Sequence, residues 1–193
     1  MSKILIVPGL AVGREHFERV AAALAEHAEY PGVTWEQFID PASWARIPGP
    51  DGQVFKIEFA FARSTERTGK VNFWLAPDYS GGSGPEPHQH PWAEINSHIL
   101  VGGYEEGRFT AQAGSVSHEI RTHGAGEVNS MLVSDYHQVT AVEPGTLTLM
   151  LCGRHTGQRW GYLDVETGRF RPNPPELHAA FLRRYEAANP HLR

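Results

Sequence analysis

The chain begins with a helical pattern of apolar residues and changes to an alternating pattern after about fifty residues. Apolar positions recur three and four places apart along residues 14–30, with charged residues on the opposite face. They are Phe17, Val20, Ala21, Leu24 and Ala28. This spacing predicts an amphipathic helix. Residues 4–10 predict an edge strand or a tether, and residues 31–52, which are rich in Pro and Trp, predict a short helix or an irregular segment packed on the main body.

From residue 54 onward the repeat is two residues long, as expected of half-buried strands. Phe55, Ile57 and Phe59 alternate with polar or smaller residues. Further extended runs follow at residues 71–75, 95–101, 108–113, 127–133, 136–142, 146–152 and 159–163. Gly, Pro, Asp or Asn separates most of these runs, and no helical crossover intervenes. The pattern therefore predicts an all-β body, a small antiparallel β-barrel.

A second helix is predicted for residues 175–188, where apolar residues form a stripe behind a proline in the first turn. The 193 residues suit one compact unit. We expect a helical extension over residues 1–52 that packs on the barrel, the barrel itself over residues 53–165, and a C-terminal helical segment over residues 166–193.

Composition excludes several classes of partner. The formal net charge is -5, and the 17 Lys and Arg residues form no block that would follow a phosphate backbone, so we expect no nucleic acid. No apolar run approaches the roughly 20 residues that cross a bilayer, so we expect no membrane. Cys152 is the only cysteine, which rules out an intrachain disulfide. We read the N-terminus as mature and expect a cytoplasmic protein with a buried Cys152.

The candidate chemistry lies in the Pro-rich run before residue 95. His88 and His90 are one residue apart, so on an extended segment both imidazoles point to the same side, and Glu94 follows four residues later. Imidazole and carboxylate suit a divalent metal ion. His137, on a strand pattern 43 residues beyond Glu94, is the best candidate for a fourth ligand. We predict that these four residues hold one metal.

Two readings of the histidines stay open. His88 and His90 could instead be polar residues of a turn. Four further histidines lack a partner at ligand spacing and are interpreted as surface or hydrogen-bonded residues; they are His98, His118, His123 and His155. His98 is the strongest of these because it shares strand parity with Glu94. Asn96 and His98 are expected to face the lumen if the strand after Glu94 stays regular.

The pattern resembles the cupin superfamily. Its first motif is matched by Gly82, His88, His90 and Glu94, with a closing glycine one place late at Gly102; its second is matched by Gly126 and His137. Leu132, Ser134 and Ala141 depart from the second motif. The run from His90 to Trp92 is also similar to a group of bacterial cupins in which the position of Glu94 is often not acidic. The resemblance covers roughly residues 55–163. It implies a jelly-roll barrel and a homodimer.

A site of three His and one Glu leaves positions for substrate and oxygen on Fe(II). The favoured function is therefore a mononuclear Fe(II) dioxygenase or oxidoreductase acting on a small molecule, with Mn, Ni or Zn as other metals. The alternatives are a redox-neutral isomerase, decarboxylase or lyase, and a non-catalytic binding protein. Trp92 and Tyr104 are candidates for an apolar pocket mouth, and Arg154 for pairing with a substrate carboxylate or phosphate.

Overall fold

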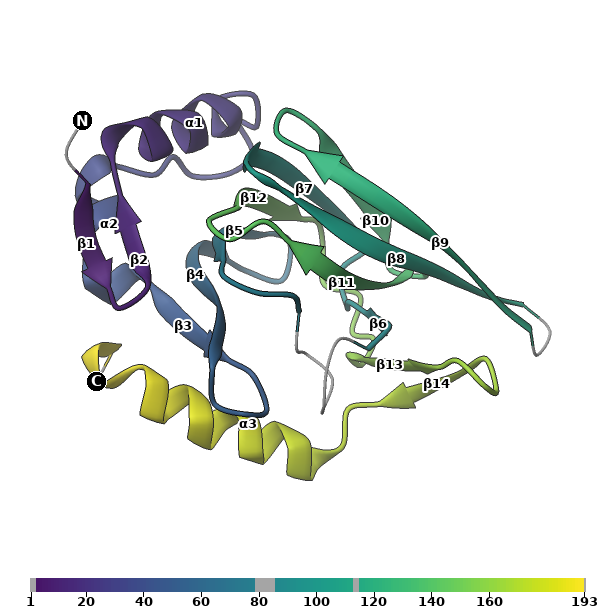
Figure 1. Ribbon diagram of the computed structural model, residues 1–193. Coiled ribbons are helices and arrows are strands. Elements are labelled where there is room, and N and C mark those ends of the chain that lie inside the picture. The colour runs from purple at the N-terminus through teal and green to yellow at the C-terminus, as the bar shows by residue number, and fades with distance from the viewer. Residues whose placement is uncertain (1–2, 79–85, 113–114, 193) are drawn as a thin grey trace.

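Two antiparallel six-stranded sheets with helices on either side make up the body of the protein (Figure 1). The computed structural model describes residues 3–78, 86–112 and 115–192. The first sheet has the strand order β10 (Val128–Leu132), β7 (Glu94–Val101), β12 (Leu147–Cys152), β5 (Thr68–Trp74), β4 (Val54–Arg63) and β3 (Ala45–Pro48). The second has the order β14 (Arg169–Pro172), β13 (Gly161–Asp164), β6 (His88–Gln89), β11 (Tyr136–Val142), β8 (Gly103–Gln112) and β9 (Ser115–Gly124).

The remaining elements lie at the two ends of the chain. The N-terminal ones are the hairpin of β1 (Ile4–Val7) and β2 (Leu10–Val12), the helices α1 (Arg14–Leu24) and α2 (Trp35–Ile39), and the 3-10 turn η1 (Pro41–Ser43). The C-terminal ones are α3 (Pro175–Ala188) and the 3-10 turn η2 (Pro190–Leu192). In Figure 1, α1 and α3 lie on opposite sides of the sheets.

The sheets depart from the expected single closed barrel. Within the described ranges, no strand pairing joins one sheet to the other. The arrangement is mostly β, with two facing antiparallel sheets, and is consistent with a jelly roll. Two strands also lie outside the range expected for the barrel: β3 precedes residue 53, and β14 follows residue 165.

Most predicted elements are confirmed, and the exceptions have physical reasons. The helix expected over residues 14–30 ends at Leu24. The next residues form turns up to Tyr30, whose hydroxyl donates to the carbonyl of Cys152, and Pro31 disfavours helix at the residue before it. Strand β9 was not predicted, because it pairs only with β8 and is exposed along most of its length, so it has no apolar alternation.

The largest apolar core lies between the N-terminal segments and the outer face of the first sheet. Its fully buried members include Val20, Phe38 and Trp44 from these segments and Ile57 and Leu149 from the sheet. Cys152 is fully buried, as predicted. Alternation along β4 and β5 thus directs many of their apolar side chains into this core, whereas Phe55 and Trp74 belong to a smaller buried cluster that also includes residues of β7, β8 and β11.

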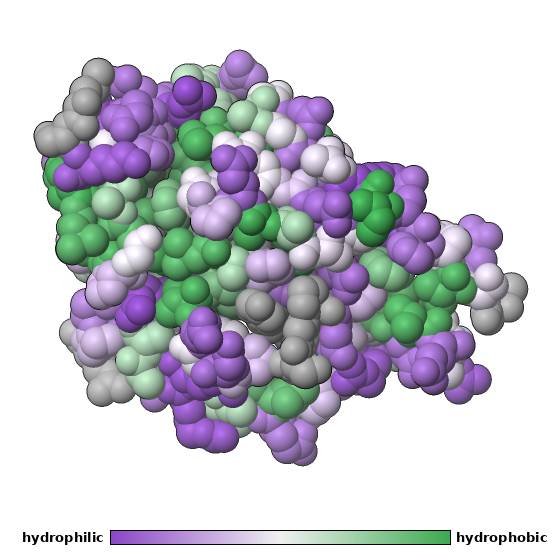
Figure 2. Space-filling view, in the orientation of Figure 1, coloured by the Kyte–Doolittle hydropathy of each residue, from purple (hydrophilic) through white to green (hydrophobic). Residues whose placement is uncertain are grey.

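Figure 2 shows an apolar area at the left edge of the molecule, over the β1–β2 hairpin. Ile4 and Leu5 in β1 are 42% and 71% exposed. None of the helices in the described part of the chain is long and apolar enough to span a membrane.

Candidate metal centre

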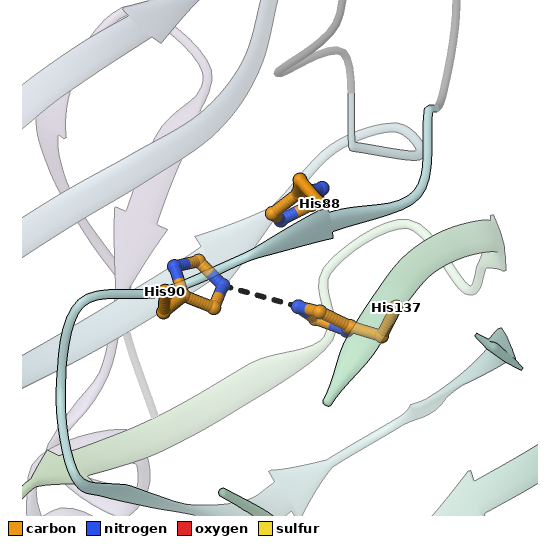
Figure 3. A group of neighbouring side chains, drawn as sticks. All are labelled: His88, His90 and His137. Carbon is orange, nitrogen blue, oxygen red and sulfur yellow. Dashed lines mark hydrogen bonds between the residues drawn. The ribbon is translucent and has the colours of Figure 1, made fainter. Parts of the chain in front are cut away.

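Three histidines meet between the sheets because β6 pairs with β11. His88 is the first residue of β6 and lies directly opposite His137 of β11, and His90 follows β6 by one residue. Strand β6 is held on its other side by β13, where Tyr162 is the partner of His88. Figure 3 shows the three rings gathered in one place. The predicted grouping of His88, His90 and His137 is confirmed.

The distances between the rings fit a common metal ion. Each ring offers one nitrogen, and these three atoms lie within 4.8 Å of one another. The Nε2 atoms of His90 and His137 are 3.1 Å apart. Two nitrogens bound at right angles to one cation, each about 2.1 Å from it, are about 3.0 Å apart. This pair is therefore spaced as two neighbouring ligands would be.

The outer nitrogens of two rings are hydrogen-bonded, which leaves their inner nitrogens with lone pairs. His88 Nδ1 donates to the carbonyl oxygen of Glu86 at 2.9 Å, and His137 Nδ1 donates to Glu106 Oε2 at 3.1 Å. Such partners fix the tautomer and orientation of a ligating imidazole. His88 Nε2 is buried and has no hydrogen-bond partner among the described residues. A buried acceptor without a hydrogen bond, beside two further imidazole nitrogens, is suited to binding a cation.

His88 and His90 are neutral at pH 7, as metal binding requires. Burial lowers the pKa of His88 to about 4, although Asp78, whose Oδ2 is 3.6 Å from His88 Nε2, partly opposes the shift. Burial also lowers the pKa of His90 well below its ordinary value, and the neighbouring His88 and His137 lower it further. His88 and His90 therefore present uncharged imidazoles at neutral pH.

This shift gives the metal-free protein a specific pH dependence. The folded-state pKa of His88 is below the unfolded value, so the unfolded chain binds more protons between about pH 6.5 and pH 4, and stability falls as the pH falls through that range. Between pH 7 and pH 5 we expect His88 alone to cost about 2 kcal/mol. Urea unfolding with a chelator present measures this loss. The same loss in a His88→Gln variant would show that another group causes it.

Glu106 on β8 supports His137 from a fully buried position. Its carboxylate accepts from Arg108 Nη2 at 2.7 Å and from Asn129 Nδ2 at 2.9 Å, in addition to His137. Burial by itself would raise the pKa of Glu106, but the hydrogen bond to His137 and the charge of Arg108 outweigh it and hold the pKa well below its usual range. Glu106 is therefore an anion that keeps the proton of His137 on Nδ1.

The structure does not bring Glu94 into this group. Glu94 is exposed at the start of β7, and its side chain lies against Gly153. The strand parity expected from Glu94 is also wrong: Ser97 lines the pocket, whereas Asn96 accepts from Ser130 at the surface and His98 packs against His27. Because side chains alternate along a strand, Glu94 shares the outward face of Asn96 and His98.

Asp78 is the carboxylate nearest to His88 in the described part of the chain. We predict that Glu94→Gln leaves the metal content unchanged, because its side chain points away from the histidines. Asp78→Asn should lower metal affinity by roughly tenfold, because it removes a negative charge 3.6 Å from His88 Nε2, the nitrogen that faces the metal site. Elemental analysis after dialysis against graded chelator compares the two amide variants. Equal losses in both would contradict the assignment.

His90 and His137 line a pocket of about 320 Å³, and His88 is buried behind them. Trp92 and Tyr104 line it, as predicted, and the rings of His90 and Trp92 are 5.7 Å apart. Burial raises the pKa of Tyr104 to about 12, so its phenol stays protonated. Arg154 does not line this pocket: it follows the end of β12, its side chain is exposed, and its carbonyl accepts from Ala93.

Three polar residues of the pocket were not predicted. Lys70 and Asn72 share the inward face of β5, and Lys56 extends from β4. Lys70 Nζ is 3.1 Å from the Glu58 carboxylate and 5.5 Å from the centre of the Trp92 ring. The sequence did not reveal them because only the apolar residues that alternate with them indicated a strand. A lysine on the polar face of a strand is ordinarily interpreted as solvent-exposed. Glu106 and Arg108 could have been found in the sequence, because they are opposite charges two residues apart on the same strand face as Tyr104.

The glycine that closes the first motif, Gly102, has a structural role. Gly102 has a φ of 68° between β7 and β8, and a Cβ there would be 2.5 Å from Thr146 Oγ1. A side chain is therefore excluded on both counts. Gly82 lies outside the described residues. His123 is 3.3 Å from Glu106 and belongs to its hydrogen-bonding network, away from the three ligands.

No protein-family model and no curated protein matches the chain. Among solved structures it is similar to KdgF from Halomonas sp., with 16% identity, a TM-score of 0.40, and coverage of 53% of this chain and 83% of that one. A cupin superfamily protein from Desulfitobacterium hafniense has 12% identity and a TM-score of 0.37, with coverage of 51% of this chain and 77% of that one. Oxalate decarboxylase from Bacillus subtilis has 14% identity and a TM-score of 0.43, with coverage of 57% of this chain and 29% of that one. These structural neighbours include the superfamily that the histidine motif resembles, and at such low identity the chemistry must come from the site itself.

Proposed function

We propose that the chain is a metal-dependent cupin enzyme in which His88, His90 and His137 hold one divalent ion, with Fe(II) favoured. The observation that carries the proposal is the convergence of three imidazole nitrogens within 4.8 Å, one of them buried without a hydrogen-bond partner among the described residues. The finer assignment is a mononuclear dioxygenase or oxidoreductase with a jelly-roll body. A bound Fe(II) would supply a Lewis acid and an electron source for reaction with oxygen.

The charges around the pocket favour an anionic substrate. Lys56 and Lys70 carry two positive charges, and Glu58 and Asp78 carry two negative ones, so the side chains near the pocket balance each other. Imidazole ligands add no negative charge of their own. The charge of a divalent ion would therefore be uncompensated, and a carboxylate is the small organic group that best neutralises it.

The pocket walls would orient such a substrate. Lys70 Nζ projects beside Trp92 and donates to carboxylate oxygens, while the Trp92 ring offers an apolar face. Asn72 is 1% exposed, its Nδ2 donates to Thr148 Oγ1, and its Oδ1 has no hydrogen-bond partner within the described residues. That free acceptor favours a substrate with a hydroxyl or amine hydrogen in addition to its carboxylate.

The test joins metal analysis to oxygen measurement. Protein purified without chelator or affinity tag is expected to contain about one metal ion per chain, as three convergent ligands imply. The Fe(II)-loaded protein is then screened with small hydroxy- and aminocarboxylates in an oxygen electrode. Oxygen consumption supports the oxygenase. Equal turnover without oxygen, with Mn, Ni or Zn in place of iron, would instead support an isomerase, decarboxylase or lyase.

A homodimer belongs to the proposal as well. Strand β9 is the outer strand of its sheet and is exposed along most of its length, so its free backbone edge is available to a second copy. Sedimentation equilibrium measures the mass. A monomer at all concentrations would remove the dimer without affecting the metal site.

A further inference from the structure

A second and larger cavity lies beneath α3, next to the metal pocket. Its volume is about 820 Å³, within the range of cavities that hold small molecules. Lys56 and Trp160 line both this cavity and the metal pocket, so they form the boundary between the two. The remaining walls come from β3, β4, β13 and one face of α3.

The helix covers this space without filling it. Leu177, His178, Phe181 and Arg184 line the cavity, and their spacing of one, three and three residues places them on one face of α3. None of the described residues of α3 is buried, and Leu177 is 41% exposed. An amphipathic helix ordinarily buries its apolar stripe against a core. Here the stripe faces a cavity instead.

Contacts at both ends hold α3 in this position. At its C-terminal end, Asn189 Oδ1 accepts from the backbone N–H of Arg46 at 2.6 Å, and Asn189 Nδ2 donates to the Arg46 carbonyl at 2.8 Å. Ahead of its N-terminal end, β14 pairs with β13. The helix is thus fixed to both sheets, and the cavity beneath it is part of the fold.

The charges on the cavity wall are of one sign. Lys56, Arg159 and Arg184 line the cavity together with apolar and aromatic residues, and no Asp or Glu is among its described lining residues. Lys56 Nζ is 3.8 Å from Glu58, outside the lining. Neither Arg159 nor Arg184 has an ion-pair partner in the described ranges, and Arg184 Nε is buried without a hydrogen-bond acceptor. Arg159 is exposed and Arg184 is half-buried; a guanidinium whose Nε is buried without an acceptor ordinarily finds an anion.

We infer that this cavity binds an amphipathic anion, a carboxylate carrying an extended apolar chain or ring. The apolar part lies against Phe55, Tyr162, Leu177 and Phe181, and Arg184 donates to the carboxylate. The same chemistry fits two sources: a separate ligand, or the distal part of a substrate whose other end reaches the metal pocket past Lys56 and Trp160. Only the second source rests on the proposed function.

Calorimetric titration with decanoate, with decanol as its uncharged counterpart, tests the inference. Decanoate should bind roughly tenfold more tightly than decanol, because a charge-assisted hydrogen bond contributes about that factor. Arg184→Gln should remove this preference. Leu177→Glu places a carboxylate at the cavity and should therefore weaken the binding of decanoate by a similar factor. The matched controls are Arg183→Gln and Leu182→Glu, which change the same helix at residues that do not line this cavity.

Equal binding of decanoate and decanol, or equal effects in the test and control variants, would overturn the inference. Circular dichroism of each variant confirms that α3 remains folded. Titrating metal-free and metal-loaded protein then distinguishes the sources: a separate ligand binds both equally, whereas a substrate that reaches the metal binds the loaded form more tightly. Binding to metal-free protein also keeps this result independent of whether the histidines hold a metal.

Discussion

Replacing His137 with alanine is expected to release the metal while leaving the protein folded. His137 Nε2 lies 3.1 Å from His90 Nε2, and His137 is the one ligand that comes from β11. Structural metal sites with four ligands bind with about 10–16 kcal/mol, so one ligand contributes about 3 kcal/mol, or roughly a hundredfold in affinity. We expect the metal content after dialysis to fall below about a tenth of that of the unmodified protein.

His118→Ala is the matched control. His118 is an exposed histidine on β9 whose ring stacks on Phe109, away from the three ligands. Its removal should leave the metal content unchanged. Retention of stoichiometric metal by the His137 variant, or an equal loss in the His118 variant, would sink the assignment of the site.

Glu106→Gln is expected to have two effects that most substitutions would not combine. It removes the carboxylate that accepts from Arg108 Nη2, while Asp135 Oδ2 still accepts from Arg108 Nη1 at 3.0 Å, so the loss of this one charged hydrogen bond should destabilise by about 1–3 kcal/mol. It also removes the negative charge beside His137 Nδ1, and the single remaining acceptor oxygen cannot serve His137, Arg108 and Asn129 together. Loss of such a partner lowers metal affinity by roughly 10–100-fold. Urea unfolding measures the first effect and competition with a metal-binding dye the second.

Glu105→Gln separates this effect from the general loss of a glutamate on β8. Glu105 accepts from Thr140 Oγ1 at 2.8 Å and is only partly buried, so its replacement should cost less than about 1 kcal/mol and leave the affinity for metal unchanged. If Glu106→Gln is destabilised but binds metal normally, Glu106 is structural and does not position His137.

The local parts of the site could be predicted because they depend on spacing alone. His88 and His90 share a face wherever the backbone is extended, and residues 136–142 alternate clearly enough to place His137 on a strand. The bounds of α3 followed from a proline in its first turn and an apolar stripe. These features need only local geometry, and each was visible in the order of the residues.

Tertiary structure decided the orientation of each face. The alternation in β7 is equally regular whichever face is inward, and the direction became known only when Ile95 and Ile99 were found in the buried clusters, with Glu94 outward. Likewise, Ile57 and Phe59 of β4 face the N-terminal segments, which leaves Lys56 to the pocket. A two-residue repeat identifies the two faces of a strand. Only packing against other segments decides which face is buried.

The supporting carboxylate also depended on long-range pairing. Glu106 reaches His137 because β8 and β11 are neighbours in the sheet, although 31 residues separate them along the chain. The sequence alone thus determined which histidines could act together and that they lie on strands. The folded sheets determined that Glu106, and not Glu94, approaches them, because contact between distant residues is set by strand order and register.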